Sequence, residues 1–513
     1  MTQYDTYTSP LAERNASRDM LRLWSPRHKF NTWRRIWLAV AEAQHEMGLP
    51  VSMEQIEELR AVVERKNPDG TVGISDAEIE AARRHERELR HDVMAHVHAL
   101  GDVCPGAKGI VHLGMTSQDV VCNADAIIID ASLSLVWTKI ARLVVGFGEQ
   151  ASRFARLPTL GFTHYQPAQP VTTGRRCAGW AYEVHLAGQA LFGAWEKSAF
   201  RGFKGATGTQ ASFLALFAGD HAKVDRFEGL ALRRLYGRDC AGMTHVICGQ
   251  TYPRVTDAIL LAGLSSVACV LHKIATDIRL LCNRKEIDEP FEDKQIGSSA
   301  MPYKRNPMRC ERVCGLTRFV MNLVGNAYDT AATQWLERTL DDSSNRRLSL
   351  PEAFLALDGA LDLMHNVAGG LVVHEATVRK NLMAELPFMA TENILMACVK
   401  LGGDRQEYHE HIRRHAQAAG MRVKQEGLDN DLIERLKGDR AFWGKGRGGA
   451  LSAELNWDGV LDPIRYVGAV SCGGRRAPSR EVRAGDRRTR RLVTQGLKPR
   501  EHPRPVVFGP SPS

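Results

Sequence analysis

The sequence predicts an all-α protein in which a long central helical bundle is flanked by two smaller helical domains. The first observation is a seam between Pro253 and Pro290, where apolar residues recur at alternating intervals of four and three, the period of a helix packed along its length. The second is that the alternation of apolar and polar residues typical of strands is scarce along the chain. The seam consists of Leu260, Leu264, Val267, Leu271, Ile274, Ile278 and Leu281.

Helix start and stop signals place further helices on either side of this seam. Ser25-Pro26 is typical of a helix start, and the apolar stripe that follows, from Phe30 to Ala41, ends before Gly48. Two later starts have the capping-box spacing, in which a serine and a Glu or Gln three residues on cap each other's backbone N–H groups. These starts are Ser52 with Gln55 and Ser75 with Glu78, and a further long helix is expected over residues 123–154.

We expect four segments along the chain. Residues 1–115 form an N-terminal helical domain, 116–370 the central bundle and 371–470 a C-terminal helical domain. From 471 to 513 the chain is rich in Arg, Gly and Pro without apolar periodicity, which is typical of a disordered tail. This tail has 11 Lys/Arg against 3 Asp/Glu, a net charge of +8 out of the chain's +9, so the folded part is close to neutral.

Composition places the chain among ordinary soluble proteins. Its 513 residues suffice for a large core in several domains, and 44% apolar with 25% charged residues is usual for globular chains. No charged-then-apolar segment opens the sequence, and the most apolar run, 258–271, is too short to span a bilayer. The 11 cysteines form no CxxC pair and suit a reducing compartment as free thiols. We therefore expect a cytoplasmic protein.

The spacing of potential ligands favours neither a metal site nor a nucleotide-triphosphate site. The histidines of RHDVMAHVH (residues 90–98) are five and two apart, whereas a helical pair of zinc ligands is four apart. Cys310 and Cys314 have that spacing, but two thiols alone are weak evidence for a metal. The Gly-rich RGFKGATGTQ (residues 201–210) does not fit the phosphate-loop pattern. We expect the protein to need no metal and no other cofactor.

Four stretches beside the predicted helices concentrate polar groups. They are RHDVMAHVH (90–98), HLGMTSQDV (112–120), TLGFTHYQPAQP (159–170) and ERTLDDSSNRR (337–347). Each also has a plainer interpretation: a polar helix face, an N-cap at Thr116 or Ser117, a hydrogen-bonded loop histidine at His164, and a solvated helix end. Taken together, they indicate connecting loops that converge on an anionic substrate.

The stretch QIGSSAMPYKRNPMRCER (residues 295–312) is a loop by composition, because its glycine and two prolines oppose helix and strand. Its charges are unusual for a simple connection, since four cations lie beside two serine hydroxyls. Such a set suits binding of a carboxylate or a polyanion. The cations are Lys304, Arg305, Arg309 and Arg312.

Part of this loop, GSSAMPYKRNP (residues 297–307), resembles the signature stretch of the fumarase/aspartase superfamily, whose members eliminate fumarate from succinyl-type substrates. Within the superfamily, further stretches resemble the adenylosuccinate lyase family, and the similarity runs from about Tyr7 to Val467. These stretches are RHDVMAHVH, TLGFTHYQPAQ, KGATGTQASF, QWLERTLDDSSNRR and LPFMATENI.

The resemblance implies a homotetramer with composite active sites. It implies cleavage of adenylosuccinate to AMP and fumarate, and of SAICAR to AICAR and fumarate, in purine biosynthesis. By the same match, Ser298 is the general base and His164 the general acid. Substrate contacts are implied at Arg14, Asn15, Arg90, His91, Asp92, Thr116, Ser117, Gln250, Lys304, Asn306, Arg312, Arg338, Ser343 and Arg347.

These residue types suit the implied reaction. Removing a proton from the carbon beside a carboxylate builds negative charge on that carboxylate, which Lys304 and Asn306 can stabilise. A serine is a poor base unless cations and N–H groups stabilise its oxyanion, whereas a histidine can give a proton to the leaving nitrogen near neutral pH. A flexible Gly-Ser-Ser segment can close over the substrate and exclude water.

Two departures from the family pattern leave alternatives open. The family typically has Arg-Tyr where this chain has Arg14-Asn15, so an aromatic contact to the nucleotide is missing or replaced. After Gly468 the resemblance gives way to the basic tail, which we expect to bind polyanions weakly. The alternatives are another fumarate-releasing lyase or a cycloisomerase of the superfamily, or a catalytically impaired structural or polyanion-binding relative.

Overall fold

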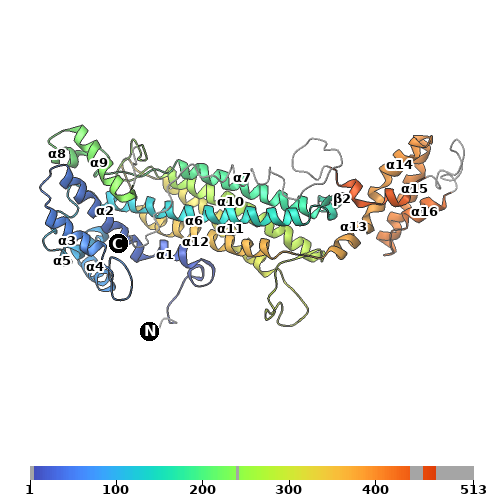
Figure 1. The fold of residues 1–513 in the computed structure, drawn as a ribbon, viewed down its shortest axis with the longest axis horizontal. Helices are drawn as coiled ribbons and strands as arrows, with labels where there is room; N and C mark the ends of the chain where they lie inside the picture. Colours follow the sequence, from blue (N-terminus) through green and yellow to red (C-terminus); the bar gives the residue numbers. More distant parts are fainter. Residues whose placement is uncertain (1–4, 238–241, 440–454, 469–513) are drawn as a thin grey trace.

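A computed structural model of the chain describes residues 5–237, 242–439 and 455–468. The molecule is elongated, with a long central bundle of helices and a smaller group of helices at each end (Figure 1). The predicted all-α class is therefore confirmed. The basic tail predicted over 471–513 lies outside the described residues.

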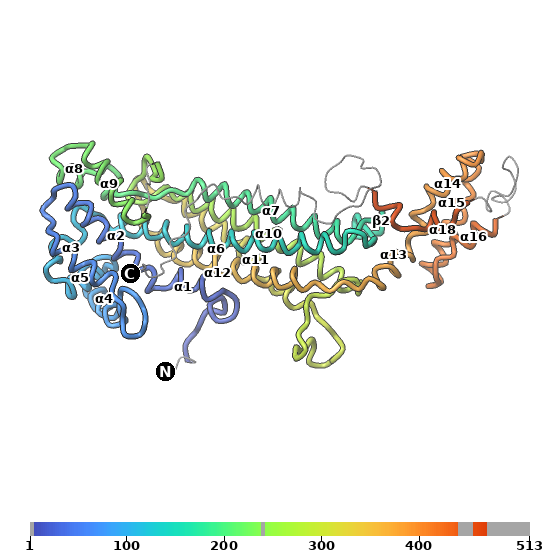
Figure 2. Tube along the Cα trace, viewed as in Figure 1, coloured from blue at the N-terminus to red at the C-terminus, as the bar shows by residue number. Residues whose placement is uncertain are grey.

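Five long helices form the central bundle, and consecutive helices run side by side (Figure 2). They are α6 (Ser117–Arg153), α7 (Thr173–Glu196), α10 (Val255–Asn283), α11 (Met308–Ala332) and α12 (Asp341–Gly369). Because a helix rises 1.5 Å per residue, the 25-residue α11 is about 37 Å long. Loops at opposite ends of one of these helices are therefore separated by the length of that helix.

The seam predicted along α10 is the centre of the bundle core. All seven predicted seam residues are buried, and they pack with buried side chains of α6, α7, α11 and α12. Full burial of one such aliphatic side chain stabilises the fold by roughly 1.5–3 kcal/mol relative to exposure. The period read from the sequence therefore identifies the main core directly.

Two helices of this bundle, α6 and α10, are long and apolar enough by length and composition to cross a membrane. The run 258–271, which is too short by itself, lies within the 29-residue α10. In each helix more than half of the most apolar window is buried inside the protein, 61% for α6 and 56% for α10. Packing against neighbouring helices accounts for much of this apolar character.

The helices at the N-terminal end have a core of their own, built around Trp33, Trp37, Phe213 and Phe227. They are α2 (Pro26–Glu46), α3 (Met53–Val63), α4 (Asp76–Leu89), α5 (Asp92–Val103), α8 (Ala211–Leu216) and α9 (His221–Tyr236), whereas α1 (Arg18–Leu23) packs on the bundle core through Met20. Ser25 caps α2 as predicted, and both predicted capping boxes are present. The short α8 and α9 come from the chain between α7 and α10, yet they pack into this N-terminal core.

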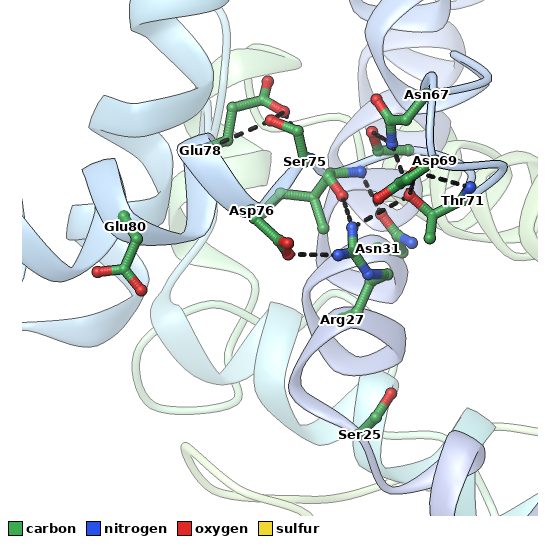
Figure 3. A network of polar contacts seen from close by, with 12 residues as sticks. Ser25, Arg27, Asn31, Asn67, Asp69, Thr71, Ser75, Asp76, Glu78 and Glu80 are labelled. Carbon is green, nitrogen blue, oxygen red and sulfur yellow. Dashed lines mark hydrogen bonds and ion pairs between the residues drawn. The ribbon is translucent and has the colours of Figure 1, made fainter. Parts of the chain in front are cut away.

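A polar network fastens the loop between α3 and α4 onto α2 (Figure 3). The Asn31 carboxamide donates to the Val72 carbonyl at 2.8 Å and accepts the Ile74 N–H at 2.7 Å, while Arg27 donates to the Ile74 carbonyl. Gly73 has φ +82°, and a Cβ there would lie 2.3 Å from the Asn31 carboxamide oxygen, so only glycine fits. This attachment fixes the start of α4, whose other end leads into Arg90.

The helices at the C-terminal end form a third core, which includes Ile394, Ile412 and Leu432. They are α13 (Glu375–Met389), α14 (Thr391–Lys400), α15 (Arg405–Gln425), α16 (Leu432–Gly438), α18 (Trp457–Val460) and η3 (Pro463–Tyr466). A short antiparallel ladder, β3 (Ile287–Asp288) with β4 (Val372–Val373), joins the end of α10 to the start of this group.

The stretch TLGFTHYQPAQP forms a β-hairpin, where the sequence predicted only a loop. Strand β1 (Pro158–Thr163) pairs with β2 (Gln166–Thr172), and Thr163 lies opposite Gln166. His164 and Tyr165 make the two-residue turn with φ of 54° and 57°. Left-handed φ at both turn positions matches the twist of a hairpin but is usually supplied by Asn-Gly, so these residues gave no local turn signal.

A buried ammonium group links α6 to α12. The Lys139 ammonium contacts Asp358 at 2.5 Å and Asp362 at 2.7 Å. Asp358 is fully buried and also accepts the Ser17 N–H at 2.7 Å, whereas Asp362 is half exposed. The two carboxylates therefore bind the same cation in different surroundings.

We predict that Asp358→Asn lowers the free energy of unfolding by about 3 kcal/mol, because it leaves the buried charge of Lys139 poorly compensated. The matched change Asp362→Asn should cost less than about 1 kcal/mol, since that carboxylate is screened by water. Urea denaturation followed by circular dichroism measures both. Equal losses in the two variants would contradict the assignment of Asp358 as the anchoring carboxylate.

Candidate active site

Polar residues from three of the four predicted stretches, 90–98, 112–120 and 337–347, meet with Gln250 where the bundle joins the N-terminal helices. Arg90 ends α4 in the left-handed conformation, with φ 53°, and His91 begins α5 by accepting the Met94 N–H at its Nδ1, 3.3 Å away. The other ring nitrogen of His91 lies 3.3 Å from the Ser117 hydroxyl at the start of α6. Arg90-His91 and Thr116-Ser117, distant in sequence, are thus neighbours.

Asp92 connects this corner to α12. The Arg347 guanidinium donates to the Asp92 carboxylate at 2.5 Å. Burial alone would raise the pKa of Asp92, but Arg347 and the Val93 N–H hold that pKa below its usual range. Burial together with Arg347 lowers the pKa of the nearby Lys29, whose ammonium lies 4.9 Å from the Trp33 ring. Lys29 sits within an ordinary-looking helical stripe, so the sequence gave no sign of it.

Arg338 is the central cation of the cluster. Its guanidinium donates to the Gln250 carboxamide oxygen and to the Ser343 hydroxyl, both at 2.9 Å. With its carboxamide oxygen turned toward the arginine, Gln118 accepts from the same guanidinium at 2.8 Å. Gln118 was not predicted, although it adjoins Thr116-Ser117 in the sequence. Arg338 and Gln250 line a hollow of about 590 Å³, whose other lining residues are Ala206, Thr207, Trp335, Leu336, Glu337 and Leu340.

A buried carboxylate organises the KGATG stretch beneath the site. Asp119 accepts the Thr116 N–H at 2.8 Å and the Lys204 N–H at 2.9 Å, and it pairs with the buried Arg201. Burial raises the pKa of Asp119, against the effect of Arg201. The stretch 201–210, which is not a phosphate loop, therefore wraps a carboxylate at the start of α6 and holds Thr116 in place.

Two further buried ion pairs support the cations of α12. Asp342 accepts from Arg254 at 2.7 Å with one oxygen and lies 3.4 Å from Arg338 with the other. Arg346 donates to Asp257 at 2.6 Å. Buried guanidinium and carboxylate groups of this kind fix side-chain direction when their hydrogen bonds are satisfied. None of these partners has a spacing in the sequence that reveals it.

The remaining predicted residues lie elsewhere. His164 is exposed at the hairpin turn, and Ser298 lies in the loop of residues 289–307, called the signature loop below, which extends from the side of the bundle (Figure 2). The Ser298 hydroxyl accepts the Met301 N–H at 3.2 Å. No hydrogen bond joins His164 to Ser298 within the described ranges.

The signature loop is drawn together at its base. The Asn306 carboxamide donates to the Gly297 carbonyl at 2.8 Å, and a Cβ at residue 297 would lie 2.0 Å from the Lys304 carbonyl oxygen. Arg309 is held by Glu292 at 2.8 Å and therefore has a structural role. Lys304 and Arg312, by contrast, make no side-chain ion pair with any described residue.

One chain therefore carries its predicted site residues in separate groups. The signature loop directly precedes α11, and Arg338 lies shortly after its other end, so the two are separated by about the 37 Å length of that helix. Asn15 packs against Gly359, 16 residues along α12 from Ser343, or about 24 Å. Gln250 and Arg338 line the hollow itself. The other predicted residues at the same end of the bundle are Arg90, His91, Asp92, Thr116, Ser117, Ser343 and Arg347.

Comparison with protein families matches residues 14–322 to the family described as "Lyase" and residues 387–472 to "Adenylosuccinate lyase C-terminus". The chain is 47% identical to adenylosuccinate lyase of Schizosaccharomyces pombe over 469 residues, 91% of this chain and 93% of the relative. The Saccharomyces cerevisiae adenylosuccinate lyase gives the same identity and coverage, and that of Pyrococcus abyssi is 34% identical over 83% of this chain and 89% of its own.

Among solved structures, the 3-carboxy-cis,cis-muconate lactonizing enzyme of Pseudomonas putida superposes with a TM-score of 0.74 at 23% identity, covering 95% of this chain and 98% of the other. A fumarate lyase from Mesorhizobium sp. BNC1 superposes with a TM-score of 0.71 at 22% identity, covering 91% and 97%. These two structures share the fold of this chain.

Two histidines pack within the N-terminal core. His96 stacks on Phe30, with ring centroids 3.8 Å apart, and burial lowers its pKa to about 3. His112 accepts the Trp37 indole N–H at 3.1 Å, and burial, with a contribution from His91, lowers its pKa to about 4. Both histidines are therefore neutral in the folded protein near pH 7.

Neutral buried histidines make stability depend on pH in a defined direction. The unfolded chain takes up the His112 proton near pH 6.5, whereas the folded chain resists it down to about pH 4. Between these values the unfolded state binds more protons, so this contribution to stability is complete above pH 6.5 and is lost as the pH falls toward 4.

We predict that His112→Asn weakens this acid sensitivity. Asparagine tolerates the left-handed backbone of residue 112, φ 71°, and can accept the Trp37 N–H, but it does not titrate. The drop in unfolding free energy between pH 7.5 and 4.5 should be smaller than in the parent protein by about 2 kcal/mol. Urea titrations at both pH values measure it, and an unchanged drop would refute the role of His112.

Proposed function

We propose that this chain, which belongs to the adenylosuccinate lyase family, releases fumarate from adenylosuccinate to give AMP and from SAICAR to give AICAR, as a step of purine biosynthesis. The observation that carries the proposal is that three polar stretches far apart in the sequence meet, together with Gln250, beside a hollow lined by Arg338. Unrelated charged residues on a surface would not be hydrogen-bonded to one another across such distances in the sequence.

The hollow binds the anionic parts of the substrate. Arg338 is preorganised by Gln250 and Ser343, and Arg347 by Asp92, so each guanidinium is held in place before the substrate arrives. Planar guanidinium groups recognise carboxylates and phosphates through paired hydrogen bonds. Because these cations are already oriented, little side-chain entropy is lost on binding.

The proton transfers belong to the other end of the bundle. Ser298 removes the proton from the carbon beside a succinyl carboxylate, and Lys304 with Asn306 stabilises the negative charge that develops there. The Ser298 oxyanion is itself favoured by the cations of its loop and by the Met301 N–H. His164 gives a proton to the leaving nitrogen, and the carbon–nitrogen bond breaks to release fumarate.

A complete site requires more than one copy of the chain. Since α11 separates Ser298 from Arg338 by its full length, an antiparallel second copy must bring its signature loop to the hollow of the first. Exposed apolar side chains on three bundle helices suit such pairing: Tyr182, Leu186, Ile259, Phe319 and Tyr328. Two perpendicular twofold axes then give a homotetramer.

We place this assembly in the cytoplasm, where the nine free cysteines of the described residues stay reduced.

Mixing two inactive variants tests this assignment. His164→Gln and Ser298→Ala should each nearly abolish loss of adenylosuccinate, yet co-assembly of the two proteins should restore activity. If the two groups of one site come from different chains, random assembly of equal amounts leaves about a quarter of the sites intact at both positions. The absorbance change of adenylosuccinate cleavage measures the recovery.

Each variant remixed with itself is the control for this experiment. Recovery of activity requires mixed tetramers, which native mass spectrometry detects from the different masses of the two chains. Mixed tetramers without activity would mean that both groups come from one chain or that one of the two roles is misassigned. Full activity of either single variant would remove that residue from the mechanism.

The basic tail gives a second, separable property. Removing residues 471–513 takes away +8 of the net charge, so binding to single-stranded RNA at low salt should weaken at least tenfold while adenylosuccinate cleavage is retained. Filter binding at 20 mM and 200 mM salt measures the RNA affinity. RNA binding by the truncated chain as tight as that of the full chain would refute this role for the tail.

A further inference from the structure

The rim of the hollow carries an unusual group of exposed apolar side chains. Five large residues on two loops, called the apolar platform below, are at least 74% exposed. They are Val246 (91%), Ile247 (84%), Trp335 (75%), Leu336 (97%) and Leu340 (74%). The two loops are joined because the Gln250 N–H donates to the Glu337 carbonyl at 3.1 Å and Gly249 lies directly against the same carbonyl. A grouped set of this kind marks an interaction surface, whereas single exposed apolar residues do not.

The backbone at the centre of the platform is strained as well as exposed. Leu336 has φ +47°, in the left-handed region that branched or bulky residues avoid. Because this leucine is almost fully exposed, packing within its own chain contributes little stabilisation to offset the strain. Strain retained at such a position is expected where a binding partner compensates for it.

The signature loop carries a matching surface. Ile296 is 76% exposed and Tyr303 84% exposed, both beside the catalytic candidate Ser298. The charges of the two surfaces are also complementary, because exposed Lys304 lies on the loop and exposed Glu337 and Asp341 lie on the platform side. Within one chain the two surfaces lie at opposite ends of α11, about 37 Å apart, so they cannot meet.

We propose that the apolar platform is the docking surface for Ile296 and Tyr303 of the signature loop of a second copy of this chain. Docking holds that loop closed over the hollow and positions Ser298 above the bound substrate, while apolar contact at the rim excludes water. The inference rests on the proposed function, because it places the loop at the same composite site, but it assigns a surface and residues that take no part in the chemistry.

Cross-linking between differently tagged chains tests the contact directly. One chain carries Tyr303→Cys and the other Leu336→Cys; the two are co-assembled, saturated with fumarate and AMP, and oxidised. We expect a disulfide-linked pair of one chain of each kind on a non-reducing gel, at least tenfold above the native-cysteine background of the parent mixture. The matched control replaces Leu336→Cys by Met421→Cys, since Met421 is 56% exposed on α15, away from both surfaces.

A kinetic arm measures whether the contact matters for turnover. Leu336→Asp and Tyr303→Ser should each lower kcat/KM at least tenfold. The kcat/KM of the double variant should lie within twofold of that of the less active single variant, because both changes break the same contact. Met421→Asp should leave kcat/KM within twofold of the parent. Thermal unfolding of each variant within about 3 °C of the parent separates lost docking from lost folding.

The outcomes separate this inference from the proposed function. A cross-link no stronger than the Met421 control, or strictly additive kinetic losses, would overturn the docking surface even if His164→Gln and Ser298→Ala complement each other. Conversely, a strong cross-link between residues 303 and 336 without complementation would support the docking surface. It would contradict the proposal that His164 and Ser298 of one site come from different chains.

Discussion

The rigid length of the central helices is the constraint on which the rest of this molecule depends. An α-helix of 25 residues cannot bring its ends together, so whatever precedes α11 is separated by about 37 Å from whatever follows it. The signature loop precedes α11, and the cations of the hollow follow it. The buried seam of α10 packs these helices side by side along their length. Within one chain, the signature loop and the hollow therefore stay apart.

Near the hollow, buried carboxylates hold neighbouring arginines and backbone N–H groups in fixed positions. Asp119 gathers the start of α6 and the 201–210 stretch, and Asp342 is shared between a buried arginine and Arg338. Such groups are costly to remove from water, and here each buried carboxylate pairs with an arginine. The consequence is a set of cations beside the hollow whose side-chain directions are fixed by their own hydrogen bonds.

The same scaffold occurs in enzymes whose sequences have diverged widely. The Pseudomonas putida and Mesorhizobium structures share this fold at 22–23% identity, so the bundle is compatible with widely different sequences. A bundle core tolerates exchange among apolar residues of similar volume. Because one fold can carry different functions, the shared fold does not identify the substrate. The family assignment here therefore depends on the relatives that are more similar in sequence.

The sequence by itself determined the elements that follow local rules. The α10 seam, the caps at Ser25, Ser52 and Ser75, and the long bundle helices all follow from periodicity and capping chemistry. It also singled out the signature loop as a candidate binding site, because glycine, proline and clustered cations are local features. The family resemblance then named candidate site residues that no local rule could have selected.

Only the tertiary structure decided which of these candidates meet. The hairpin at His164 has no turn signal because its left-handed residues are His and Tyr, and strand pairing alone holds them there. Gln118, Asp342 and Lys29 gained their roles from partners far away in the sequence. The separation of Ser298 from Arg338 is likewise a matter of helix length and direction in space. Contacts between residues hundreds of positions apart depend on how helices pack, and local sequence chemistry does not encode them.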